Sequence, residues 1–195
     1  MSAVLVRSLM ATAVALVAAV VTAPPIIRSL VRLRVGQVVR GDGPASHLAK
    51  TGTPTMGGVI MLIATLAGSL VAAGSHVRDL GWALFVSTGC GLIGMLDDYI
   101  SIVAHRPLGL RARQKLLFQL VLGLVLGAYG YITPGLGSAI AIPFTRGAQL
   151  DLGVWYIPFA ALVLVSATNA VNLTDGLDGL AGGTVAIASF AYVAI

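Results

Sequence analysis

Four polar residues recur at every third position between residues 169 and 183, in the stretch NAVNLTDGLDGLAGG: Asn169, Asn172, Asp175 and Asp178. They stand between two very apolar segments of a chain in which only 10% of the residues are charged, against about 25% in a typical soluble domain. Carboxylates at or near a membrane are costly and point to function by default. The spacing therefore raises the possibility of a ligand site at the end of a membrane span.

A single continuous helix would not bring these four side chains to one ligand. Steps of three residues turn about 300°, so successive side chains drift by about 60° around the helix. We therefore expect one helix to end near Asn172, a turn over Leu173–Leu177, and a new helix from about Asp178, so that the side chains converge. The structural alternatives are that Asp175 or Asp178 caps the second helix, and that Asn169 and Asn172 form hydrogen bonds between helices.

Asp97 and Asp98 form an adjacent acidic pair in GLIGMLDDYI, at the end of another apolar segment. At the C-terminal end of a helix the macrodipole is negative and disfavours anions, so capping does not explain the pair. A bound cation does, because Mg²⁺ is held by carboxylate oxygens. The alternative is a pair of solvated acids at the membrane interface.

Two basic segments could supply charge to a phosphate. Lys50 opens KTGTPTMGG, residues 50–58, where a glycine-rich turn could also bind phosphate through backbone N–H groups. This is not a Walker loop, and a tight entry turn explains it equally well. In GLRARQKLLFQL, residues 109–120, Arg111, Lys115 and Gln119 share one helical face. Lys115 is the candidate for chemistry, and the arginines there are interpreted as membrane anchors.

These residues need apolar helices to position them. Each helix that crosses a membrane needs about 20 apolar residues, with a lower limit near 17. Six windows meet or nearly meet this length: Leu9–Ile27, Gly57–Gly74, Leu80–Leu96, Leu116–Ile132, Leu152–Thr168 and Gly179–Ile195. The prediction is an all-α, polytopic transmembrane helical bundle forming one domain over residues 1–195. Pro24 and Pro25 should kink or end the first helix.

The net charge of +5 reflects the orientation of the helices in the membrane and does not indicate a nucleic-acid partner. Nine of the twelve Lys and Arg residues lie in two loops, between windows one and two and between windows three and four. The positive-inside rule makes these loops cytoplasmic and the N-terminus exterior. Asp97, Asp98, Asp175 and Asp178 then face the cytoplasm. The loop of residues 133–151 should be exterior and form a short hairpin.

Two alternatives concern the ends of the chain. Val21-Thr22-Ala23 resembles a signal-peptidase site, but cleavage there would expose a basic loop on the exterior, so we interpret the segment as the first helix. The last window reaches Ile195 with no polar flank after it. We therefore expect the chain to be the front part of a longer protein.

As a set, four motifs resemble the polyprenyl-phosphate N-acetylhexosamine-1-phosphate transferases, and most closely their phospho-N-acetylmuramoyl-pentapeptide transferase branch. The motifs appear in the family's order: KTGTPTMGG, GMLDDY, GLRARQKLLFQ and NAVNLTDGLDGLA. The resemblance implies Mg²⁺-dependent transfer of phospho-MurNAc-pentapeptide from UDP-MurNAc-pentapeptide to undecaprenyl phosphate. The products would be lipid I, a precursor of peptidoglycan, and UMP.

The same resemblance implies roles for individual residues. Asp97 and Asp98 would bind the metal and activate the lipid phosphate. The other residues matching catalytic positions are Lys50, Lys115, Asn172 and Asp175. Residues matching substrate-binding positions are Thr55, Asn169, Gly176, Leu177 and Asp178, of which the last three would meet the uridine side of the nucleotide.

This chain also departs from the family. Ser101 stands where members often have lysine, and members have about ten spans, with a late acidic residue and a histidine-rich motif that are not in these residues. We therefore expect this chain alone to be inactive. The expected location is a bacterial plasma membrane, in contact with lipid, and a homodimer is left open. The alternatives are a transferase of the N-acetylglucosamine-1-phosphate branch and, in a different class, a cation transporter that uses the aspartates.

Overall fold

The computed structural model describes residues 3–32, 55–73, 77–104, 109–145, 147–175 and 179–194. These residues fall into two compact units, residues 1–115 and residues 116–195, which are described separately below. The prediction of one domain over the whole chain stays a prediction. Lys50, Gly176, Leu177 and Asp178 lie outside the described residues.

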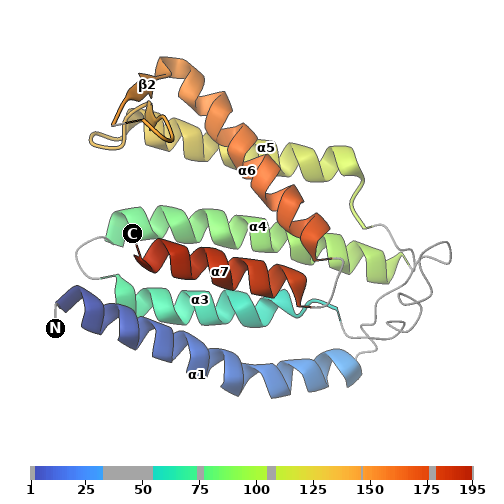
Figure 1. Cartoon of the computed structure of the whole chain (residues 1–195). Helices are drawn as coiled ribbons and strands as arrows, with labels where there is room; N and C mark the ends of the chain where they lie inside the picture. Colours follow the sequence, from blue (N-terminus) through green and yellow to red (C-terminus); the bar gives the residue numbers. More distant parts are fainter. Residues whose placement is uncertain are drawn as a thin grey trace. The chain divides into compact units, whose positions relative to one another are not determined.

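The first unit contains three apolar helices: α1 (Ala3–Arg32), α3 (Gly58–Ala72) and α4 (Val77–Val103). Figure 1 shows α3 lying between α1 and α4. A glycine permits the close approach of α1 and α3, since a Cβ atom at Gly68 would lie 2.9 Å from the carbonyl oxygen of Ala11 and 3.0 Å from Cβ of Ala15. Small residues at such crossings let the backbones of membrane helices approach closely.

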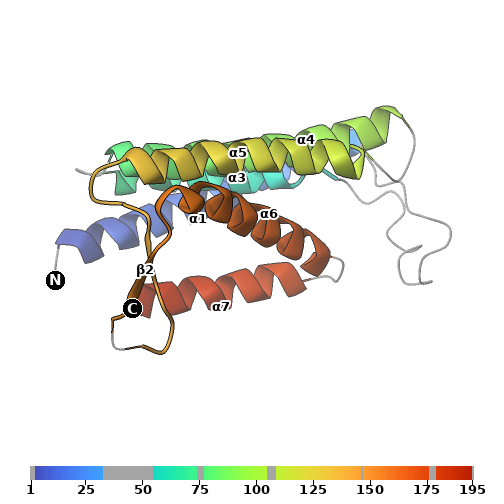
Figure 2. The same ribbon diagram turned by 90° about the horizontal axis from the view of Figure 1, so that it is seen from above.

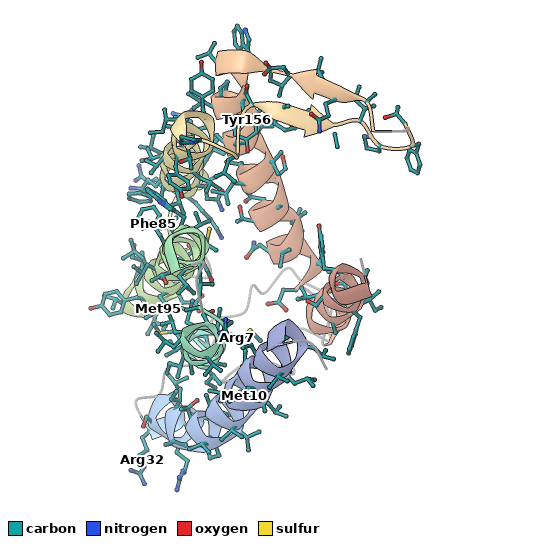
Figure 3. All side chains as sticks on the ribbon, turned by 90° about the vertical axis from the view of Figure 1, so that its left-hand side faces the viewer. Arg7, Met10, Arg32, Phe85, Met95 and Tyr156 are labelled. Carbon is teal, nitrogen blue, oxygen red and sulfur yellow. The ribbon has the colours of Figure 1, made fainter. Side chains whose placement is uncertain are left out.

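Helix α1 continues through Pro24 and Pro25 to Arg32, so of the two predicted outcomes, a kink or an end of the helix, the prolines do not end it. Proline removes a backbone donor, and it is tolerated in membrane helices where other groups satisfy the freed carbonyls. Arg28 Nε and Ser29 Oγ donate to the carbonyls of Pro24 and Pro25, which lie one turn beyond the carbonyls that the prolines free. Figure 1 shows the axis of α1 changing direction in its second half, and Figure 3 labels Arg32 at its end.

The second unit begins within α5 (Ala112–Ile132), which leads to a β-hairpin, a short 3₁₀ helix η1 (Gly153–Trp155), α6 (Tyr156–Thr174) and α7 (Leu180–Ala194). The hairpin confirms the predicted one: β1 (Ala139–Ala141) pairs antiparallel with β2 (Gln149–Asp151), with Ile140 opposite Leu150. Figure 2 shows that the chain reverses direction between α6 and α7.

Glycines on α5 let α6 pack tightly against it. A Cβ atom at Gly123 would lie 2.6 Å from Cα of Ala161, and one at Gly127 would lie 2.6 Å from the carbonyl oxygen of Ile157. Gly130 faces the ring of Tyr156, which Figure 3 labels at the start of α6. Among the described residues, the few buried side chains include Leu122 on α5 and Ala161 on α6, so this seam is a core of the second unit.

All six predicted windows form helices, and the fold is an all-α polytopic membrane fold apart from the hairpin. Within the described ranges, four helical segments are long and apolar enough to cross a membrane: Leu5–Arg32, Leu80–Val103, Ala112–Ile132 and Gly153–Thr174. Helices α3 and α7 are apolar but shorter. Many large apolar side chains on these helices are exposed, which suits contact with lipid or with further helices.

Candidate functional site

Asp97 and Asp98 lie inside α4, not at its end as predicted, because the helix continues to Val103. Neighbouring residues on a helix point about 100° apart. The two carboxylates therefore reach different segments of the chain, and each accepts hydrogen bonds from the segment that it faces. Asp97 contacts the segment that leads into α5, and Asp98 contacts the segment that leads into α3.

Both oxygens of Asp97 are engaged by the start of α5. The backbone N–H of Leu110 donates to Oδ1 at 2.7 Å, and Lys115 Nζ donates to Oδ2 at 3.1 Å. This ion pair is partly shielded, since the exposed fractions of the two side chains are 21% for Lys115 and 26% for Asp97. The structure places Lys115 beside the acidic pair, with its ammonium held by a carboxylate, and its catalytic role stays a prediction.

Gly109 makes the approach to Asp97 sterically feasible. A Cβ atom at Gly109 would collide with the backbone carbonyl oxygen of Asp97, so a residue with a side chain does not fit there. At the next residues, the backbone N–H of Arg111 donates to Gln114 Oε1 at 3.0 Å. This is the glutamine half of a capping box, and it fixes the first turn of α5. The glycine and the cap together bring Lys115 to Asp97.

Asp98 holds the end of the glycine-rich segment that precedes α3. Its Oδ2 accepts from Thr55 Oγ1 at 2.9 Å and from the backbone N–H of Met56 at 3.1 Å. Met56 has φ of 68°, a left-handed conformation that costs a residue with a side chain roughly 1–2 kcal/mol. The bond to Asp98 helps to maintain this conformation. In the part of the chain that the structure describes, no donor bonds to Oδ1 of Asp98.

The structure thus brings Thr55, Asp97, Asp98 and Lys115 into one cluster, within the first unit. The described residues contain no group of three or more His, Cys, Asp or Glu side chains that could hold a metal. Two adjacent carboxylates nevertheless offer the oxygen ligands that a hard divalent cation takes, and Asp98 Oδ1 accepts no hydrogen bond from the described residues. Magnesium binding at this cluster stays a prediction.

The predicted residues of the second unit lie on α6. Asn169 is partly buried, and its Nδ2 donates to Gln119 Oε1 on α5 and to the carbonyl of Val165, both at 2.8 Å. This confirms the alternative in which Asn169 forms a hydrogen bond between helices. Asn172 and Asp175 are exposed. That all these residues share a pocket with Asp97 and Asp98 stays a prediction.

The break after α6 differs from the predicted one by a few residues. Helix α6 continues through Asn172 to Thr174, because Leu173 and Thr174 keep helical bonds. Asp175 is its C-cap residue and therefore does not cap the following helix, which begins at Leu180. Gly179, with φ of 80°, lies at the turn into α7.

Three participants were not assigned from the sequence. The backbone N–H groups of Met56 and Leu110 bind the acidic pair, and side-chain patterns carry no signal for them. Gln119 is 4% exposed and binds Asn169. Its place on the face of Arg111 and Lys115 was evident, but the partner on α6 was not.

Comparison with known proteins identifies the family of this chain. The model of the family described as glycosyl transferase family 4 matches residues 80–195, which include α4 with its acidic pair and all of the second unit. The chain belongs to glycosyl transferase family 4.

Three similar proteins share one name. The chain is 49% identical over 189 residues to a phospho-N-acetylmuramoyl-pentapeptide-transferase of Moorella thermoacetica, covering 96% of this chain and 58% of the relative. It is also 46% identical to a protein of the same name from Pelobacter propionicus, covering 96% of this chain and 52% of that relative. The identity to a protein of that name from Desulfitobacterium hafniense is 46%, covering 97% of this chain and 56% of that relative. The chain spans about half the length of the curated relatives that it matches.

Proposed function

We propose that the enzyme containing this chain transfers phospho-MurNAc-pentapeptide from UDP-MurNAc-pentapeptide to undecaprenyl phosphate, giving lipid I and UMP. The observation that carries the proposal is the pair Asp97 and Asp98, in a family 4 chain, with Lys115 bonded to one carboxylate and Thr55 to the other. The names of relatives that are 46–49% identical support the choice of substrate.

The proposed reaction moves one phosphoryl group. An oxygen of the lipid phosphate attacks the β-phosphorus of the UDP-sugar, a new P–O bond forms, and the bond from the β-phosphorus to the bridging oxygen breaks, so that UMP leaves. The lipid phosphate is largely ionised near neutral pH, and direct attack therefore needs no strong base. Catalysis then depends on positioning and on neutralising charge at the phosphoryl oxygens.

The residues of the cluster have distinct parts in this proposal. Lys115, held by Asp97, places a positive charge next to the acidic pair and would bind a phosphate oxygen. Asp98 and Asp97 would hold Mg²⁺, with Oδ1 of Asp98 as the oxygen that has no donor among the described residues. Bound Mg²⁺ would supply neutralisation of the pyrophosphate charge. Lys50, Asn172, Asp175 and the 176–178 stretch are proposed to complete the substrate site.

The proposed location is the inner membrane of a bacterium, with the N-terminus outside and the acidic pair at the cytoplasmic face. The support is charge: nine of twelve basic residues lie in the loops between the first two windows and between the third and fourth. The lipid acceptor would approach from the bilayer, and the nucleotide sugar from the cytoplasm.

The test is UMP release by the full-length enzyme in detergent with undecaprenyl phosphate. UDP-MurNAc-pentapeptide should support turnover in Mg²⁺, and EDTA should stop it. Turnover with UDP-N-acetylglucosamine instead would contradict the assigned substrate. Mg²⁺ flux into proteoliposomes without UMP release would contradict the enzyme assignment and favour transport.

A further inference from the structure

Gln119 on α5 is a buried polar side chain whose described partner is Asn169. It is 4% exposed, and its Oε1 accepts a hydrogen bond from Asn169 Nδ2 at 2.8 Å. Gln119 lies one helical turn before Gly123, where the absence of a side chain on α5 lets Ala161 of α6 approach closely. The close packing of the helices thus brings Gln119 within reach of Asn169.

The contacts of Asn169 determine which way its amide group points. A backbone carbonyl can only accept, so the atom that faces the carbonyl of Val165 must be Nδ2. That same nitrogen donates its second N–H to Gln119, so both of its donors are used. The remaining atom, Oδ1, has no donor bonded to it among the described residues, and Asn169 is only partly buried. Among the described residues, Asn169 Oδ1 is therefore an acceptor without a donor.

We propose that Gln119 is a positioning residue that fixes Asn169 with Oδ1 outward, to accept a hydrogen bond from a hydroxyl or N–H group of the nucleotide sugar. This inference rests on the proposed function and adds to it the direction of one hydrogen bond, which the substrate donates and Asn169 accepts. Phosphate oxygens only accept, so Asn169 does not bind the pyrophosphate. The partner is instead a donor on the uracil, the ribose or the amino sugar.

Asn169 lies one helical turn before Asn172, and residues three apart share a helix face. Loss of Gln119 would leave Asn169 held by Val165 alone, free to turn about its side-chain bonds. A ligand would then have to order this amide on binding, which weakens substrate binding more than it slows the chemical step. A purely structural contact between helices would instead change stability and leave substrate discrimination unchanged.

The first experiment compares three variants of the full-length enzyme in the UMP-release assay. Gln119→Met removes the acceptor at equal length and should raise KM for UDP-MurNAc-pentapeptide about tenfold, the effect of one hydrogen bond, with kcat within about twofold. Gln119→Glu keeps an acceptor oxygen and should raise KM by less than about threefold. Gln149→Met, at an exposed glutamine on the hairpin, is the matched control and should leave KM unchanged.

The second experiment finds the donor. Nucleotide-sugar analogues would each lack one donor: methylated at uracil N3, deoxygenated at ribose C2′ or C3′, or deoxygenated at C4 or C6 of the sugar. With wild-type enzyme, the analogue that lacks the donor to Asn169 should lose about tenfold in kcat/KM. In Gln119→Met this penalty should shrink to less than about threefold, while the other penalties stay unchanged.

The outcomes separate the two proposals. If wild-type enzyme releases UMP but every analogue penalty is the same in Gln119→Met, the positioning role is overturned, whatever the change in thermal stability. If wild-type enzyme releases no UMP from the unmodified substrate, the proposed function itself is overturned, and this inference with it.

Discussion

Lys115 Nζ lies 3.1 Å from Asp97 Oδ2, and this ion pair fastens the first turn of α5 to α4. We predict that Asp97→Asn lowers turnover of the full-length enzyme on the order of 100-fold or more, because the lysine loses the charge that places it. UMP release measures the effect. Because the pair is only partly buried, the loss of stability should be small, about 1 kcal/mol or less.

Asp151→Asn is the matched control for this prediction, since Asp151 is an exposed aspartate on the hairpin. It should retain turnover within about twofold. Normal turnover in Asp97→Asn would contradict the role given to the acidic pair, whereas equal losses in both variants would indicate a general effect of removing negative charge.

The second prediction concerns Gly109. Gly109→Ala should destabilise the enzyme by about 1–3 kcal/mol, because a Cβ atom there collides with the backbone carbonyl of Asp97 and the surrounding backbone must move. The thermal midpoint in detergent would record the loss, and turnover should fall with it as Lys115 shifts. Gly81→Ala on α4 is the control, since its Cβ meets open space, and it should be neutral or slightly stabilising.

The hydroxyl of Thr55 is the subject of the third prediction. Thr55→Val keeps the shape but removes the donor to Asp98, which should cost about 0.5–1.5 kcal/mol of stability and lower kcat/KM about tenfold. Thr55→Ser keeps the donor and should retain most activity. Equal behaviour of the valine and serine variants would mean that the hydrogen bond to Asp98 has no part in turnover.

The fourth prediction concerns pH and the hairpin. Hydrogen bonds from Ser138 Oγ and from the backbone N–H of Gly153 lower the pKa of Asp151, because they favour the ionised carboxylate. Its contribution to hairpin stability is therefore present above the ordinary aspartate value of about 3.9 and is lost as pH falls through the lower folded pKa. Carbon-13 NMR of the Asp151 carboxyl group should give a midpoint below that ordinary value.

Ser138→Ala provides the comparison for this titration. Removing the hydroxyl should raise the pKa of Asp151 toward its ordinary value, leaving the smaller effect of Gly153. An unchanged midpoint would show that the Ser138 bond does not form in solution.

The hydrophobic windows predicted the helices well because membrane spans depend on local composition. The boundaries were less predictable. The predicted window ended at Leu96, yet α4 continues to Val103, since helical bonds persist outside the apolar core. At Pro24 and Pro25 the local penalty is outweighed by the long helix on both sides.

The chemistry-bearing side chains could be chosen from the sequence, but their partners could not. Asp98 and Thr55 are 43 residues apart, and Gln119 and Asn169 are 50 residues apart. Such pairs depend on how helices pack, which side-chain spacing within one helix does not specify. Asn169 is an example. The three-residue spacing of polar residues made it a candidate, whereas its partner Gln119 could be identified only from the contact between α5 and α6.

The glycine seam between α5 and α6 has a consequence for protein engineering. Gly123 and Gly127 pack against Ala161 and Ile157 with no room for a methyl group on either glycine. The surfaces of α5 and α6 are therefore complementary to each other. A chimaera that imports α5 from a relative should therefore import α6 as well. Recombination libraries with a crossover point inside the hairpin would separate the two halves of this seam and should yield few folded enzymes.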